Sequence, residues 1–366
     1  MQMKRFAFRS LLIAFLTLLL LECLTRIAGL DAIVQRRIFF GLEPKNPNGI
    51  FAVYQIDPDM IFRLRAGLSN LKINEQDNQV HFTVSTDSRG FRTQAGSAPE
   101  GGAARPILAL GDSCTFGYGA DDSGTYPARL GELMTGARGG KHQVVNSGVP
   151  GWTALQGRIF LERNIESLRP GLVVAGFGYN DCSVMAGLAD SAVAERFALR
   201  PWERAFPFSA LARTAHSLRV GSFLKAWATL ERPAGSIDKT SPARLTQDEF
   251  REALSEICAL CAQRRVPLVF VAWPMSLEVY TGMNPADDTL LGEKGPDYLA
   301  KYVAYKKTLR EVAAAAGIPV VDPTEALKAA GKDDLYVDPF HLTADGYAIV
   351  AQAVLKTVLE LRPAIP

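Results

Sequence analysis

The sequence has no excess of charge of either sign. It contains 366 residues, with 40 Lys and Arg against 38 Asp and Glu, and its formal net charge is +2. Nucleic-acid-binding proteins concentrate basic side chains on one surface to displace counterions from phosphates, so we expect no nucleic-acid partner. Hydrophobic residues make up 48% and charged residues 21% of the chain, which excludes wholesale disorder.

Cysteine and histidine are also scarce, with five and four residues respectively. Cys258 and Cys261 form a CxxC inside the helical pattern EFREALSEICALCAQRR, but no second pair of Cys or His stands nearby, as a zinc site requires. We therefore interpret these two, together with the single residues Cys114 and Cys182, as small buried side chains. The sequence predicts no metal ion and no cofactor.

Long apolar runs are absent except near the N-terminus. There, Leu11 to Leu21 is apolar apart from Thr17 and follows a basic head of three residues, Lys4, Arg5 and Arg9. A basic head before an apolar run is typical of a secretory signal or of a single membrane anchor. Residues 1–30 are therefore predicted to be a signal-anchor or transmembrane segment.

The residues after this run favour an uncleaved anchor over a cleaved signal. No A-x-A-like cleavage site follows, since Glu22, Cys23 and Arg26 occupy the region of small residues. Glu22 and Arg26, at i and i+4 of a helix, can form an ion pair at the membrane edge. The positive-inside rule places the bulk of the chain on the extracytoplasmic side, which is the periplasm in a Gram-negative bacterium. Secretion after signal cleavage is the alternative.

Two patterns divide the rest of the chain. Residues 31–100 contain short alternating runs, such as Ile50 to Ile56 and Val80 to Val84, which predict a small β-rich lead-in. After the stretch SAPEGGAARP, residues 101–362 alternate helical patterns with five apolar runs: ILAL at 107–110, QVVN at 143–146, LVVAGF at 172–177, PLVFVAW at 267–273 and IPVVD at 318–322. This alternation predicts an α/β domain with a flavodoxin-like, doubly wound parallel sheet of five strands.

The interval 183–247 interrupts the alternation. It contains the helical stretch SALARTAHSLRVGSFLKAWATL, whose apolar residues fall near one face. We interpret the interval as a helical insertion packed on the domain. An amphipathic lid or a contact with a membrane surface is the alternative.

Polar clusters follow the predicted strands at the edge where a doubly wound sheet binds its ligands. Ser113 comes three residues past the first strand, in GDSCTFGYG. The second strand is followed by NSGVPGW, with Gly148, and the third by GYND, with Asn180. The last apolar region precedes LYVDPFHLTADGY, with Asp338 and His341 in one turn. We expect the four clusters to meet in one site.

These residue types suit nucleophilic catalysis. A serine is a weak nucleophile until an imidazole removes its proton, and that imidazole needs a carboxylate to hold its tautomer. Only His341 has an aspartate, Asp338, nearby in a loop after the final core strand. We interpret the other histidines as surface or packing residues: His81, His142 and His216.

Taken in order, GDS, Gly148, GYND and DPFH resemble the four signature blocks of the SGNH (GDSL-type) hydrolase family. The resemblance covers roughly residues 85–362, including a GFR segment before the first strand. It implies that Ser113 is the nucleophile, that His341 is the general base and then acid, and that Asp338 orients it. It also implies an oxyanion hole made by the backbone N–H groups of Ser113 and Gly148 and the side-chain amide of Asn180.

The family resemblance predicts a serine esterase or deacylase that hydrolyses an acylated small molecule, carbohydrate or lipid through an acyl-enzyme. A polysaccharide O-acetyltransferase is the alternative, because the family includes such enzymes and the two reactions differ only in the acyl acceptor. A non-catalytic, membrane-tethered binding module is a further alternative, although a scaffold has no need for the complete Ser, His, Asp, Gly and Asn set. Asp112 and Asp181, which flank the site, are interpreted as acceptors for loop amides.

Overall fold

The computed structural model describes residues 2–42, 46, 48–75, 79–93, 105–138, 142–183, 189–228, 243–279, 295–331 and 334–361. The five predicted strands form one parallel sheet: β5 (Ile107–Gly111), β6 (Val144–Asn146), β7 (Leu172–Gly176), β8 (Leu268–Val271) and β9 (Val320–Val321). Their order across the sheet is β6-β5-β7-β8-β9. This order confirms the predicted doubly wound α/β fold.

Helices cover both faces of this sheet, which explains why its inner strands are apolar throughout. Every residue of β5, β7 and β8 is buried. The main covering helices are α4 (Tyr126–Arg138), α5 (Ala154–Leu168), α10 (Gln247–Gln263), α12 (Gly295–Ala315) and α14 (Ala344–Glu360). They pack in two groups, α4 with α14 and α5 with α10 and α12. The shorter elements are α3 (Ser113–Phe116), η2 (Asp122–Gly124), α6 (Tyr179–Cys182), α11 (Ser276–Val279) and α13 (Thr324–Ala329).

The described residues of the lead-in form a helix followed by two antiparallel strand pairs. β1 (Tyr54–Asp57) pairs with β2 (Ile61–Leu64), and β3 (Leu71–Glu75) pairs with β4 (Val80–Val84). The run Val80 to Val84 is thus a strand, whereas Ile50 to Ile56 is shared between the 3-10 turn η1 (Ile50–Val53) and β1. Its first part differs from the predicted β-rich pattern and forms a helix, α2 (Leu30–Leu42), which packs against α9, η1 and β1.

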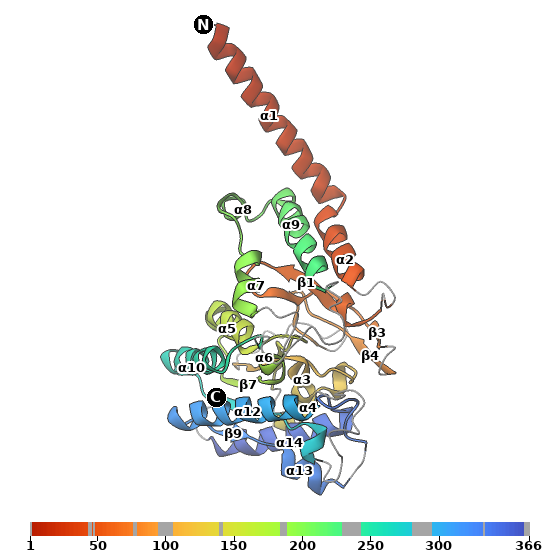
Figure 1. Ribbon diagram of the computed structural model, residues 1–366, viewed down its shortest axis with the longest axis vertical. Helices are drawn as coiled ribbons and strands as arrows, with labels where there is room; N and C mark the ends of the chain where they lie inside the picture. The colour runs from red at the N-terminus through yellow and green to blue at the C-terminus, as the bar shows by residue number, and fades with distance from the viewer. Residues whose placement is uncertain are drawn as a thin grey trace.

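Helix α1 (Gln2–Ile27) stands out from the rest of the molecule (Figure 1). Its segment Arg5–Ile27 is long and apolar enough to cross a membrane, and the most apolar stretch of the segment is not buried. By length and composition it is either an anchor or a signal sequence. The predicted pair of Glu22 and Arg26 is confirmed, with 2.6 Å between Arg26 Nε and Glu22 Oε1.

The described residues of the insertion form three helices, α7 (Asp190–Phe197), α8 (Pro201–Ala205) and α9 (Ala210–Ala228). Helix α9 packs against both α1 and α2, and α8 lies beside it at the end of the molecule from which α1 projects (Figure 1). The stretch predicted to be helical is therefore a packed helix over its described length. Residues 184–188 and 229–242 of the interval lie outside the described residues.

Arg92, from the GFR segment, ties the lead-in to the parallel-sheet domain. Its guanidinium group is buried, forms an ion pair with Asp122 (2.9 Å) and donates to the carbonyl oxygens of Phe116 (2.9 Å) and Gly117 (2.8 Å). It also donates to the carbonyl oxygen of Thr83 in β4 (2.8 Å). A buried charge with this many partners holds the turn after α3 in one position.

Candidate active site

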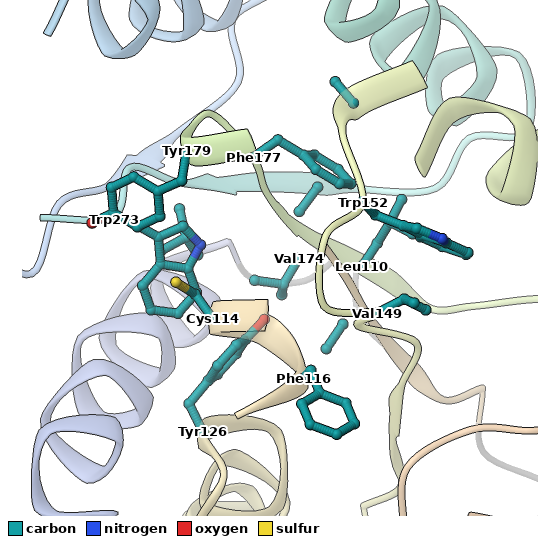
Figure 2. Packing of buried hydrophobic residues seen from close by; sticks show 14 of the residues in the cluster. Leu110, Cys114, Phe116, Tyr126, Val149, Trp152, Val174, Phe177, Tyr179 and Trp273 are labelled. Atoms are coloured by element: carbon teal, nitrogen blue, oxygen red, sulfur yellow. The ribbon is translucent and has the colours of Figure 1, made fainter. Parts of the chain in front are cut away.

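Ser113 begins α3 directly after β5, at the carboxyl edge of the sheet. Asp112 shapes this turn, because its Oδ1 accepts a hydrogen bond from the backbone N–H of Cys114 (2.9 Å). The Cys114 side chain points into the buried cluster that contains Tyr126 and Trp273 (Figure 2). Ser113 therefore takes the other direction, and it keeps 8% of its surface exposed.

The structure brings Ser113, His341 and Asp338 together in one chain of hydrogen bonds. His341 Nε2 lies 2.7 Å from Ser113 Oγ, and His341 Nδ1 lies 2.6 Å from Asp338 Oδ2. Asp338 Oδ1 accepts the backbone N–H groups of Phe340 and His341, both at 2.8 Å. Burial raises the pKa of Asp338, but His341 and these hydrogen bonds outweigh it and hold the pKa below its usual value.

Two further contacts fix the histidine. The ring of Tyr118 stacks on that of His341 with 4.4 Å between centroids, and the His341 carbonyl oxygen accepts from the N–H of Val337 (2.9 Å). Sequence reasoning missed Tyr118, although it stands five residues after Ser113 in the same glycine-rich turn. The stacked ring limits rotation of the imidazole and so favours the alignment needed for proton transfer.

The amide groups predicted to bind an oxyanion differ in whether hydrogen bonds within the protein already occupy all of their N–H hydrogens. Asn180 Nδ2 donates to the carbonyl oxygen of Trp152 (3.0 Å), which leaves its second hydrogen for another acceptor. The N–H of Gly148 already donates to Asn146 Oδ1 (3.0 Å). Gly148 is glycine for a packing reason, since a Cβ there would lie 2.2 Å from the amide nitrogen of Phe116 in α3. The geometry thus does not support the oxyanion role expected for Gly148.

In the described part of the chain, Gly151, three residues further on, has the free backbone N–H and the partial exposure that Gly148 lacks. Among the described residues, the N–H groups of Gly151 and Ser113 donate to no acceptor. Gly151 is partly exposed, and it adopts a φ of +82°, which favours glycine. It also precedes Trp152, whose carbonyl oxygen binds Asn180. The sequence signal was the second glycine of NSGVPGW.

The insertion holds the loop that carries Gly151. Arg244 donates to the carbonyl oxygen of Gly151 (2.6 Å) and forms a buried ion pair with Asp190 (2.8 Å). Asp190 in turn accepts from Thr153 Oγ1 (2.9 Å). Both ends of the interval 183–247 therefore contribute to the position of this loop.

Asp112 and Asp181 bind loop amides, as expected. Both Asp181 oxygens accept backbone N–H groups, from Ala154 (2.7 Å) and Gly178 (2.8 Å). Burial raises the pKa of Asp181 to about 7. Burial likewise raises the pKa of Asp112 to about 6, although the Cys114 amide opposes this. The second oxygen of Asp112, Oδ2, is buried and has no hydrogen-bond partner among the described residues.

Replacing Asp112 by asparagine is expected to remove the loss of folding stability that this buried, ionisable carboxyl group causes, which is complete above about pH 6. Because its folded-state pKa of about 6 exceeds the usual 3.8, this group lowers stability as pH rises from about 4 through 6. At about 1.4 kcal/mol per pH unit, the loss reaches about 3 kcal/mol at neutral pH. The melting temperature of Asp112→Asn relative to wild type should therefore be higher at pH 8 than at pH 5. Exposed Asp248→Asn is the control, and an unchanged difference for Asp112→Asn would contradict the argument.

The remaining histidines and cysteines lie away from the hydrogen-bonded chain or are buried. His81 is exposed on β4, His142 precedes β6, and His216 is buried in α9. The described cysteines are free, and four of them are buried: Cys114, Cys182, Cys258 and Cys261. Burial raises the pKa of the Cys258 and Cys261 thiols to about 11 and about 12, which makes them poor nucleophiles. No group of three or more potential metal ligands occurs in the described part of the chain.

A serine, a histidine and an aspartate linked by hydrogen bonds at the carboxyl edge of a parallel sheet form the arrangement used by serine hydrolases. The family model confirms and narrows this class. The chain belongs to the GDSL-like lipase/acylhydrolase family, whose model matches residues 109–349, and it is an SGNH (GDSL-type) hydrolase that acts on esters.

Solved structures similar to this chain are distant from it. A lipase/acylhydrolase from Enterococcus faecalis is 19% identical, with a TM-score of 0.43 over 69% of this chain and 95% of that one. An acetylxylan esterase from Geobacillus stearothermophilus is 16% identical, with a TM-score of 0.42 over 72% of this chain and 98% of that one. No curated protein matches the chain.

Proposed function

We propose that the protein is a serine esterase or deacylase that works through an acyl-enzyme. The hydrogen-bonded chain from Ser113 through His341 to Asp338, at 2.7 and 2.6 Å, is the observation that carries this proposal. Ser113 Oγ forms a bond to the acyl carbon while His341 Nε2 takes its proton, and the same proton then passes to the leaving alkoxide as the ester C–O bond breaks. Water repeats the sequence on the acyl-enzyme, releases the acid and restores Ser113.

The oxyanion hole in this proposal is made by the N–H groups of Ser113 and Gly151 and by Asn180 Nδ2. Gly151 replaces Gly148, because the Gly148 amide is bonded to Asn146 while the Gly151 amide has no acceptor among the described residues. Such donors stabilise the negative oxygen of the tetrahedral intermediate, each by about 3–4 kcal/mol where this has been measured in other enzymes.

We also propose an extracytoplasmic enzyme, held by α1, whose substrate is a water-exposed acylated carbohydrate or small molecule rather than a lipid within the bilayer. The basic head of α1 and the absence of a cleavage signal support the anchor and its orientation. Helix α3, which carries Ser113, lies on the far side of the lead-in strands from α1 (Figure 1). An acyl group buried in the same membrane would have to leave it to reach Ser113.

The experiment follows the fate of the acyl group in the full-length protein in detergent. We expect a fluorophosphonate to label the Ser113 peptide, and acetate to be released from p-nitrophenyl acetate at the same rate as p-nitrophenol, with or without added oligosaccharide. Mass spectrometry and acetate assays measure both products. Acetyl groups that appear on the oligosaccharide faster than free acetate would identify an O-acetyltransferase instead. Absence of labelling would favour a binding module.

A further inference from the structure

Three large aromatic side chains lie exposed on α8 and on the loop between α8 and α9. Trp202, Phe206 and Phe208 expose 46%, 62% and 82% of their surface. Phenylalanine and tryptophan normally bury such area, and neighbouring exposed aromatics mark a surface for a partner or a membrane. We name these three residues the aromatic loop.

The aromatic loop is attached to the base of α1. Glu22 accepts hydrogen bonds from Ser209 Oγ (2.7 Å) and from the N–H groups of Ala210 (2.9 Å) and Leu211 (3.0 Å), which begin α9. Arg26 donates to the carbonyl oxygen of Phe208. Figure 1 shows α8 and the start of α9 at the level where α1 joins the rest of the molecule. The aromatic loop is therefore fixed at one position along the axis of α1, near Glu22 and Arg26.

That position corresponds to the interfacial layer of a bilayer. Arg26 stands five residues beyond Leu21, the last residue of the apolar run, which is about 7.5 Å along a helix. The polar layer on each side of the hydrocarbon core is roughly 5–8 Å thick. If α1 spans the membrane, Phe208 lies within this layer, where aromatic side chains are favoured.

The loop is held in place by a buried carboxylate. Glu203 of α8 is buried, accepts the N–H of Arg200 (2.7 Å) and pairs with Arg219 of α9 (2.9 Å). Because Glu203 points inward, its neighbour Trp202 is presented to the outside. Arg200 and Arg204 are exposed and form no ion pair among the described residues, so their charges are available to anionic lipid headgroups.

We propose that the aromatic loop inserts into the membrane interface beside α1, so that the catalytic domain is attached to the bilayer at two points. This inference rests on the anchor assigned to α1 under the proposed function. A lipid surface is the occupant favoured by the structure, because the aromatic loop is hydrogen-bonded to the base of the apolar helix. It is also flanked by Arg200 and Arg204, which form no ion pair among the described residues. Two attachments prevent rotation about α1 and hold α3 away from the bilayer (Figure 1).

The test uses the full-length protein in phosphatidylcholine vesicles whose acyl chains carry bromine, a quencher of tryptophan fluorescence. The contribution of Trp202 is the wild-type emission minus that of Trp202→Phe, which retains the buried Trp152 and Trp273. We expect bromine near the headgroups to reduce the Trp202 contribution by at least half, and iodide in the water to leave it unchanged. Trp227 is present in both proteins, so its emission cancels in this difference.

A second variant retains Trp202 as the fluorescent reporter and replaces the two phenylalanines that would enter the membrane interface. Phe206→Ser/Phe208→Ser should restore most of the Trp202 emission in brominated vesicles and make it accessible to iodide. Val303→Ser is the matched control, since Val303 is also exposed (49%) but lies on α12, away from α1 (Figure 1). This variant should behave as wild type.

Flotation of the vesicles after an alkaline wash separates the two ways in which the inference can fail. Protein that floats but whose Trp202 emission is quenched by iodide and not by bromine retains the anchor and overturns the docking. Trp202 that is protected from both quenchers would indicate a protein partner, such as a second copy, and would also overturn it. Protein that does not float contradicts the anchor itself, while the ester hydrolysis assay decides the catalytic proposal independently.

Discussion

Replacing Ser113 by alanine should lower kcat for ester hydrolysis by about 10⁶-fold, to the level that binding and the oxyanion donors alone provide. Ser113 Oγ is the only group that His341 Nε2 contacts at 2.7 Å in the described site, so its removal leaves no nucleophile for acyl transfer. Cys114 does not substitute for it, because burial raises the pKa of its thiol well above the usual value and its side chain points into the core (Figure 2).

Initial rates of p-nitrophenyl acetate hydrolysis by the full-length protein in detergent measure this effect. His341→Ala should cause a similar loss, since the two residues act as one unit and their effects are not additive. Ser255→Ala, at an exposed position of α10, is the control and should leave the rate unchanged. Activity retained by Ser113→Ala, in a preparation free of other esterases, would refute the proposed nucleophile.

Asp338→Asn should lower kcat by about 10⁴-fold, less than the loss of Ser113. The backbone N–H groups of Phe340 and His341 would hold the asparagine oxygen at the position of Oδ1. Its amide nitrogen would then face His341 Nδ1, to which it can only donate. This forces the ring proton onto Nε2, so that the atom facing Ser113 can no longer accept a proton.

The melting temperature, measured beside the rate, distinguishes this tautomer effect from a general loss of structure. The variant should keep the melting temperature of wild type within a few degrees, because both amide hydrogen bonds to Oδ1 persist. Asp248→Asn provides the control substitution at an exposed aspartate. A rate equal to that of wild type would show that Asp338 does not set the tautomer of His341.

The grouping of the candidate site residues could be predicted from the sequence because each stands directly after an apolar strand or in a short local motif. Ser113 follows β5, Asn180 follows β7, and Asp338 is three residues from His341. A doubly wound sheet brings such strand ends to one edge irrespective of the details of packing. The strand order β6-β5-β7-β8-β9 meets that expectation.

The supporting residues could not be predicted in this way, because their roles depend on long-range contacts. Gly148 and Gly151 are both glycines of NSGVPGW, and the hydrogen bond from the Gly148 amide to Asn146 distinguishes them only in the folded structure. Arg244 reaches the Gly151 carbonyl oxygen across 93 residues of chain. Tyr118 stacks on His341 although more than 200 residues lie between them in the sequence.

The sequence by itself thus determined the apolar N-terminal helix, the α/β sheet and the hydrogen-bonded Ser113, His341 and Asp338, because hydrophobic periodicity and local motifs encode these features. Only the tertiary structure decided which amides remain free for an oxyanion and where the insertion lies. Its position beside α1 follows from hydrogen bonds between Glu22 and the start of α9, some 187 residues apart. Contacts of this kind depend on how complete elements pack, and no local pattern of residues records them.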